Sequence, residues 1–192
     1  MRVISGERRG AKLITREDEG VRPTTDRVKE SMFNLIGMFF PCGKVLDLFS
    51  GSGALSIEAL SRGAENAVCV DSDSASMAVT KKNYENLRFL DRAEFFLCDA
   101  SSYLKKCTDK FDMIFLDPPY NKGLITPVME LLWKNSLLTD NGIVVLESDG
   151  CDTLPDFSGF SILKQRKYGR TVVTLYKKEV EVDENSSISG EF

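Results

Sequence analysis

The chain has 192 residues, enough for one well-buried domain with a small appendage. A hydrophobic content of 42% and a charged content of 28% are ordinary for a globular protein, and no apolar run approaches the roughly 18 residues that a membrane-spanning helix needs. The first residues lack the apolar core of a secretory signal, so we expect a cytoplasmic protein with no membrane partner.

The five cysteines are scattered and form no C-x-x-C pair, and the sequence contains no histidine. Isolated cysteines beside apolar runs behave as small hydrophobic residues. We therefore expect neither a disulfide framework nor a metal site.

The net charge of −4 is unevenly distributed. Residues 179–192 contain five acids and no Lys or Arg, whereas residues 161–178 contain six basic residues and no acid. The composition of 179–192 predicts a disordered acidic tail. The rest of the chain keeps a modest basic surface, which permits RNA binding without establishing it.

Residues 1–30 are charged, poor in large apolar side chains and interrupted by glycines, which predicts a small N-terminal β-rich arm. A helix is expected from about Thr25, because Val28, Met32 and Phe33 begin an apolar face at helical spacing. Residues 31–178 are expected to form the main domain.

From Lys44 onward, apolar strands and helices alternate at the spacing of βαβ units. Strands are expected at 44–49, 66–71, 93–99, 111–117 and 141–148, and helices at 54–63, 74–87, 100–107 and 125–138. Strands apolar on both faces indicate a parallel sheet covered on both sides. Segments 160–169 and 170–178 follow each other directly and predict a terminal antiparallel hairpin. The fold class is α/β, a doubly wound sheet.

The stretch "DLFSGSGAL" follows the first of these strands. Gly51 and Gly53 can adopt positive φ and let a ligand approach the backbone. A dinucleotide site would need G-x-G-x-x-G, and Ser56 occupies the third glycine position, so a simple tight turn remains an alternative.

Acidic residues end the second and third strands. Asp71 lies 20 residues after Gly51, the separation at which a carboxylate can accept both hydroxyls of a ribose. Asp99 could accept from an adenine amino group. Each has an alternative interpretation as a helix N-cap, a role that Ser72 or Asp73 could also take. Taken together, the glycine loop and the two acids describe a nucleoside pocket.

The fourth strand ends in "DPPY". Pro118 and Pro119 stiffen the corner. Asp117 and the Pro118 carbonyl can each accept one hydrogen of an exocyclic amine, and Tyr120 offers a face for stacking a base. Two acceptors favour a more tetrahedral nitrogen and aim its lone pair at an incoming electrophile, so the corner suits catalysis by positioning a purine amino group.

The sequence contains "VLDLFSGSGALSIEALSRGA", "FLDPPY", "GVRPTTDRVKESMFNLI" and "KYGRT". Together these segments resemble the bacterial 16S ribosomal RNA guanine-N2 methyltransferases of the RsmD family, over roughly residues 1–178. The D-P-P-Y element alone is shared by many amino-methyltransferases. The first, third and fourth segments are more specific.

The resemblance implies a class I, Rossmann-like, seven-stranded fold that uses S-adenosylmethionine. The residues expected to line that cofactor are Asp47, Phe49, Gly51, Ser52, Gly53, Asp71, Ser72, Asp99 and Ala100. The residues expected to take the guanine are Asp117, Pro118, Pro119 and Tyr120. The family's arm is associated with RNA and with closing the site, so the candidate RNA contacts are Arg2, Arg9, Arg22, Arg27 and, in the hairpin, Arg170. The expected partner is 16S rRNA in the 30S subunit or an assembly intermediate, bound by a monomer without a metal.

Other functions stay open. An adenine-N6 methyltransferase acting on DNA or RNA shares the D-P-P-Y element. Glutamine-modifying relatives usually carry Asn in place of Asp117, and a nicotinamide-dependent reductase would leave the D-P-P-Y corner unexplained. A non-catalytic RNA-binding assembly module is the alternative outside the enzymes.

Overall fold

The structure is a computed structural model that describes residues 1–16, 26–37, 40–119, 123–152 and 154–179. Predictions concerning Arg22, Tyr120 and the tail beyond Glu179 lie outside these ranges. The helices are α1 (Asp26–Ile36), α2 (Ala54–Ser61), α3 (Ser74–Leu87), α4 (Ala100–Leu104) and α5 (Ile125–Lys134), with a 3-10 turn at Leu90–Arg92. The strands are β1 (Lys44–Asp47), β2 (Asn66–Asp71), β3 (Ala93–Leu97), β4 (Phe111–Leu116), β5 (Leu138–Asp149), β6 (Phe160–Tyr168) and β7 (Thr171–Lys178).

The strands form one seven-stranded sheet in the order β3-β2-β1-β4-β5-β7-β6. β1 to β5 pair in parallel, whereas β7 is antiparallel to both β5 and β6. The order of the parallel strands reverses between β1 and β4, and ligands of such sheets bind at the carboxyl ends of the strands at this point. The predicted fold class, with its antiparallel terminal hairpin, is confirmed.

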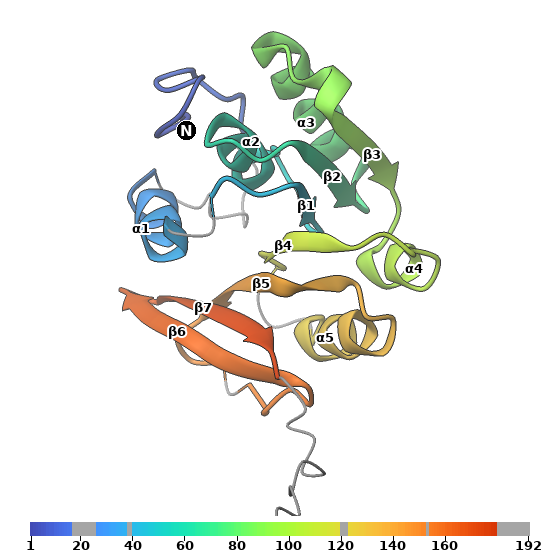
Figure 1. The fold of residues 1–192 in the computed structure, drawn as a ribbon. Coiled ribbons are helices and arrows are strands. Elements are labelled where there is room, and N and C mark those ends of the chain that lie inside the picture. The colour runs from blue at the N-terminus through green and yellow to red at the C-terminus, as the bar shows by residue number, and fades with distance from the viewer. Residues whose placement is uncertain (17–25, 38–39, 120–122, 153, 180–192) are drawn as a thin grey trace, which may run out of the picture.

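Helices cover both faces of the sheet (Figure 1). One buried cluster lies under α1, α2 and α3 and includes Phe33, Ile57 and Tyr84. A second lies under α4 and α5 and includes Leu104 and Val128. Strand residues alternate between the two clusters because successive side chains point to opposite faces of a sheet.

The boundary between α5 and β5 differs from the prediction. The apolar run suggested a helix through residue 138, but α5 ends at Lys134 and Leu138 already pairs with Phe111 of β4. Ser136 has a φ of 51°, a left-handed conformation that stops a helix and turns the next two leucines into the core. Apolar residues therefore continue across the boundary, and periodicity alone could not locate it.

The sequence predicted a sheet that is covered on both faces, but the edge strand β3 is partly exposed. Phe96 is 38% exposed and Leu97 is 57% exposed. β3 has only one neighbouring strand, so the helices that cover the centre of the sheet do not enclose it.

The described part of the N-terminal arm, residues 1–16, packs against α2 and contains one antiparallel bridge, Arg2 to Lys12, in place of longer strands. Its anchor is Glu58 of α2, fully buried, whose carboxylate accepts from the amides of Ile4 at 2.7 Å and Ser5 at 3.0 Å. The buried Lys29 Nζ lies 3.3 Å from the same carboxylate. One ion pair thus joins the arm, α1 and α2.

No helix within the described residues is long and apolar enough to cross a bilayer.

Candidate active site

The glycine loop connects β1 to α2 at the point where the strand order reverses. Gly51 has a φ of 55° and Gly53 a φ of 75°, as the sequence predicted for a tight strand-to-helix turn. A Cβ added at Gly51 would find only the Phe49 carbonyl oxygen, 3.9 Å away, so the space beside this residue is open. A Cβ at Gly53 would lie 3.0 Å from the Thr80 side chain. The first glycine therefore offers its backbone to a ligand, and the second permits close packing.

Asp71, at the end of β2, holds this loop. Its Oδ2 accepts from the Gly51 amide at 2.7 Å, and its Oδ1 accepts from the Asp73 amide at 2.9 Å. The N-cap of α3 is Asp73, not Asp71 or Ser72, because the Asp73 side chain accepts from the Ala75 amide. Asp71 thus lies beside the open backbone of Gly51, while Ser72 is exposed next to it. The contact of Asp71 with a ribose stays a prediction.

Asp47, at the end of β1, is 1% exposed and points under the loop. Its Oδ2 accepts from the Ser56 hydroxyl at 2.8 Å and the Ser56 amide at 3.3 Å. Burial raises the pKa of Asp47 to about 7, opposed by the Ser56 hydrogen bonds and reinforced by the charges of Asp117 and Asp71. Two other acids of the predicted site, Asp71 and Asp117, are therefore close enough to affect Asp47.

Ser50 was not among the predicted site residues. Its backbone amide donates to the Val70 carbonyl at 3.0 Å, which fixes the residue between β1 and β2. Its Oγ is buried and has no hydrogen-bond partner among the described residues. A buried hydroxyl without a partner costs free energy, so its position beside the loop fits a contact with a bound ligand. A serine in a run of small loop residues carries no sequence signal for this role.

The other predicted cofactor residues flank this centre. Phe49 and Ser52 are half-buried, and Ala100 is 7% exposed at the start of α4. Asp99 caps α4 by accepting from the Ser102 amide at 2.8 Å. Hydrogen bonding by the Ser102 side chain, followed by that of the Ser102 amide, lowers the pKa of Asp99. The capping role is thus observed, and the proposed contact of Asp99 with an adenine stays a prediction.

The D-P-P corner begins directly after β4. Asp117 is half-buried, Pro118 is buried and Pro119 is exposed. Asp47 at the end of β1 pairs with Phe115 of β4, two residues before Asp117, so the two acids lie at the ends of neighbouring strands. The charge of Asp117 accordingly helps to raise the pKa of Asp47. The structure therefore brings Asp117 and the glycine loop to one edge of the sheet.

A further acid, Glu147, was missed from the sequence. Leu116, the last residue of β4, pairs with Leu146 of β5, so Asp117 follows β4 at the level of Glu147 within β5. Val145, two positions before Glu147, belongs to the cluster under α1, so the Glu147 side chain points to that face. Glu147 is 3% exposed. In the sequence it was part of an ordinary apolar strand, "IVVLES", with no motif of its own.

The described candidate RNA contacts are all exposed, but two of them have acidic partners. Arg2 lies 3.5 Å from Asp26, and Arg170 lies 3.0 Å from Asp149. These side chains are 67% and 75% exposed, so the ion pairs contribute little and leave the guanidinium groups accessible. Arg9 and Arg27 are exposed as well. Their contact with RNA remains a prediction.

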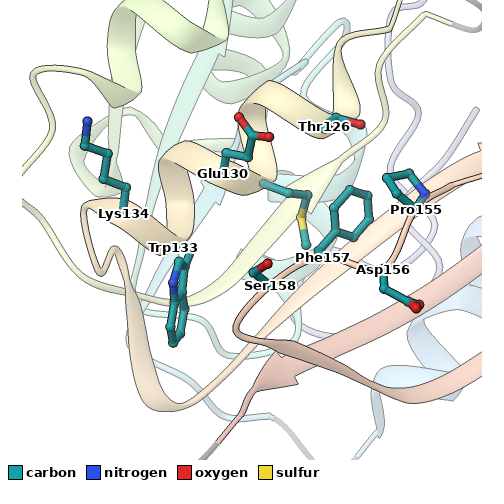
Figure 2. A pocket seen from close by; sticks show the side chains of 9 residues that line it. Thr126, Glu130, Trp133, Lys134, Pro155, Asp156, Phe157 and Ser158 are labelled. Atoms are coloured by element: carbon teal, nitrogen blue, oxygen red, sulfur yellow. The ribbon is translucent and has the colours of Figure 1, made fainter.

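A pocket of about 390 Å³ lies between α5 and the chain that precedes β6 (Figure 2). It contains no residue of the glycine loop or of the D-P-P corner, because the end of α5 and the start of β6 lie toward the opposite edge of the sheet. The lining residues are Thr126, Met129, Glu130, Trp133, Lys134, Pro155, Asp156, Phe157 and Ser158. It is separate from the candidate active site.

Comparisons with known proteins show which family the chain matches. Residues 1–177 match the family described as Conserved hypothetical protein 95. YlbH of Bacillus subtilis, named as a candidate rRNA methyltransferase, is 40% identical over 93% of this chain and 99% of its own length. Ribosomal RNA small subunit methyltransferase D of Escherichia coli is 34% identical over 94% and 91%, respectively. The solved structure of yhhF from Escherichia coli, a candidate methyltransferase, superposes with a TM-score of 0.83 at 33% identity and covers 93% of this chain and 98% of that one.

Proposed function

Because this chain belongs to the Conserved hypothetical protein 95 family, whose relatives include small-subunit rRNA methyltransferases, we propose that it methylates the exocyclic N2 of a guanine in 16S rRNA with S-adenosylmethionine as methyl donor. The observation that carries this proposal is that the glycine loop and the D-P-P corner lie at the same edge of the sheet. The glycine loop with Asp71 suits the cofactor, and the D-P-P corner suits an amine.

The residues present fit the cofactor. The open backbone at Gly51, the Asp71 carboxylate and the unpartnered Ser50 hydroxyl offer contacts for a nucleoside with a polar amino-acid tail. When bound, S-adenosylmethionine supplies a methyl group activated by an adjacent sulfonium. The protein's own task is to hold that carbon opposite the amine and to keep water away.

At the D-P-P corner, Asp117 and the Pro118 carbonyl accept the two hydrogens of the amine and direct its lone pair toward the methyl carbon. With S-adenosylmethionine bound, its methyl carbon would pass from sulfur to N2, and Asp117 or water would accept the proton that N2 then loses. No covalent link to the protein is needed. The target base must leave its stack to reach a strand end, so an unpaired or opened region of the RNA is the expected substrate.

Two acids at the same level of neighbouring strands, Asp117 after β4 and Glu147 within β5, favour guanine over adenine. The Watson–Crick edge of guanine presents the adjacent N1–H and N2–H donors, whereas adenine has an acceptor at N1. Asp117 and Glu147 are the acceptors that we assign to these two donors. Since Glu147 is 3% exposed, a base that reaches it must displace the chain that covers it.

The test uses 30S particles from a strain that lacks this protein, with duplex DNA as the competing substrate. Nucleoside mass spectrometry should find N2-methylguanosine in the rRNA and no N6-methyladenine in the DNA. Asp117→Ala should retain cofactor affinity while its turnover falls by about 100- to 1,000-fold. Asp109→Ala, an exposed acid paired with Lys44, is the matched control and should keep full activity. Near-normal turnover of Asp117→Ala would contradict the assigned role.

The choice of base has its own variant. Glu147→Gln keeps the side-chain size but replaces the charged carboxylate by a neutral amide, which has one acceptor oxygen fewer and an NH2 donor in its place. We expect kcat/KM for the guanine substrate to fall at least tenfold, with cofactor affinity unchanged. Unchanged kcat/KM would remove Glu147 from the recognition of guanine.

A further inference from the structure

One buried amide links the N-terminal arm to the glycine loop. Asn83 of α3 is 1% exposed. Its Nδ2 donates to the Ile14 carbonyl and to the Ser52 carbonyl, both at 2.9 Å, and its Oδ1 accepts from the Ile14 amide at 2.8 Å. Both hydrogens of the amide group are therefore used, one for each segment. Ile14 and Ser52 are far apart in the sequence, and this side chain fixes their relative position.

On the loop side, Asn83 acts together with Thr80, one helical turn earlier on the same face of α3. The Thr80 hydroxyl donates to the Gly51 carbonyl at 2.9 Å. Two consecutive carbonyls of the loop, those of Gly51 and Ser52, thus point to α3. The Gly51 amide points to Asp71. The backbone orientation that a ligand would meet is set by these contacts.

On the arm side, Asn83 is the buried attachment of Ile14, whose own side chain is 45% exposed and adds little packing. Arg16 forms a second contact with α3, through an ion pair to Asp73, the N-cap residue. That pair lies at the surface, where such interactions contribute little. Among the contacts that residues 14–16 make with α3, the hydrogen bonds of the buried amide are therefore the stronger ones.

We propose that Asn83 is a positioning residue that couples the arm to cofactor binding. When S-adenosylmethionine binds the glycine loop, it stabilises the observed orientation of the Ser52 carbonyl. That carbonyl keeps its hydrogen bond with Asn83, and Asn83 in turn keeps its hydrogen bonds with Ile14. By thermodynamic linkage, a docked arm strengthens cofactor binding by the same factor. This inference rests on the proposed function only in naming the ligand.

The test is amide hydrogen exchange on the full chain, with and without saturating S-adenosylmethionine. Binding is first measured by calorimetry, so a chain that binds no cofactor contradicts the proposed function and not merely the coupling. In the wild type, we expect the cofactor to slow exchange of the Ile14 amide about five- to tenfold. A bound cofactor that leaves the Ile14 exchange rate unchanged would overturn the coupling.

Two variants separate coupling from loss of structure. Thr80→Val removes the bond to the Gly51 carbonyl but leaves Asn83 intact, so cofactor affinity should fall while the slowing at Ile14 persists. Asn83→Ala should lower affinity about tenfold and abolish the slowing. If Asn83→Ala does not fold, Asn83→Asp, which keeps an acceptor but no donor, replaces it. Equal slowing in the wild type and in the Asn83 variant would refute the proposal.

Discussion

Substitution of Lys29 by Met tests how the arm and α1 are attached to the sheet. Lys29 and Glu58 are both fully buried, with Nζ and Oε2 3.3 Å apart. Lys29 also donates to the Arg2 carbonyl at 2.7 Å. Methionine fills a similar volume with an unbranched apolar chain, so the change removes the charge and its hydrogen bonds without leaving a large cavity.

The expected cost follows from the carboxylate that stays behind. Removal of one partner of a buried ion pair typically costs about 3–5 kcal/mol, because the remaining charge cannot be hydrated. Glu58 keeps a contact with Arg62 at 2.8 Å and two backbone donors, which favours the lower end of that range. We therefore expect the free energy of unfolding to fall by about 3 kcal/mol.

Urea unfolding followed by circular dichroism measures this change, and the dependence on urea concentration should stay the same. Lys82→Met, at an exposed site on α3, is the control and should change stability by less than about 0.5 kcal/mol. Burial lowers the pKa of Lys29 despite the opposing charge of Glu58. The native state then releases its proton at lower pH than the unfolded state, so wild-type stability should rise as pH increases toward 10.5, and the variant should lose this rise. A loss of less than about 1 kcal/mol in Lys29→Met would refute the reasoning.

Three further changes test the candidate site. Because the pKa of Asp47 is raised to about 7, the free energy of unfolding of the wild type should fall as pH rises from 3.8 to about 7. Asp47→Asn should remove this fall when urea unfolding is measured at several pH values in that range. The same pH dependence in the variant and the wild type would contradict the raised pKa. In thermal unfolding, Gly53→Ala should destabilise the protein by more than Gly51→Ala. Both positions have positive φ, but only an alanine at position 53 would place its Cβ 3.0 Å from the Thr80 side chain. Equal losses of stability would argue against that contact. Asp71→Asn should weaken S-adenosylmethionine binding at least tenfold by calorimetry, and unchanged affinity would exclude a ribose contact.

Much of the architecture could be predicted from the sequence because its signals are local. Alternating apolar strands and helices indicated the parallel sheet, and the direct succession of 160–169 and 170–178 indicated the hairpin. The separation between Gly51 and Asp71 predicted a carboxylate beside the loop, where the structure shows a 2.7 Å hydrogen bond. Strand ends collect at one edge of such a sheet whatever their loops contain.

Other features depend on contacts between segments that are distant in the chain. Lys29 and Asn83 occur in polar stretches that indicate exposed helix faces, and only packing against the arm buries them. Glu147 gains its position from the register of β5 against β4, which no local pattern specifies. Periodicity determines which face of an element is apolar. Which polar group lies beneath another segment is decided by tertiary packing, since burial of a charge or an amide is tolerated only where specific partners meet it.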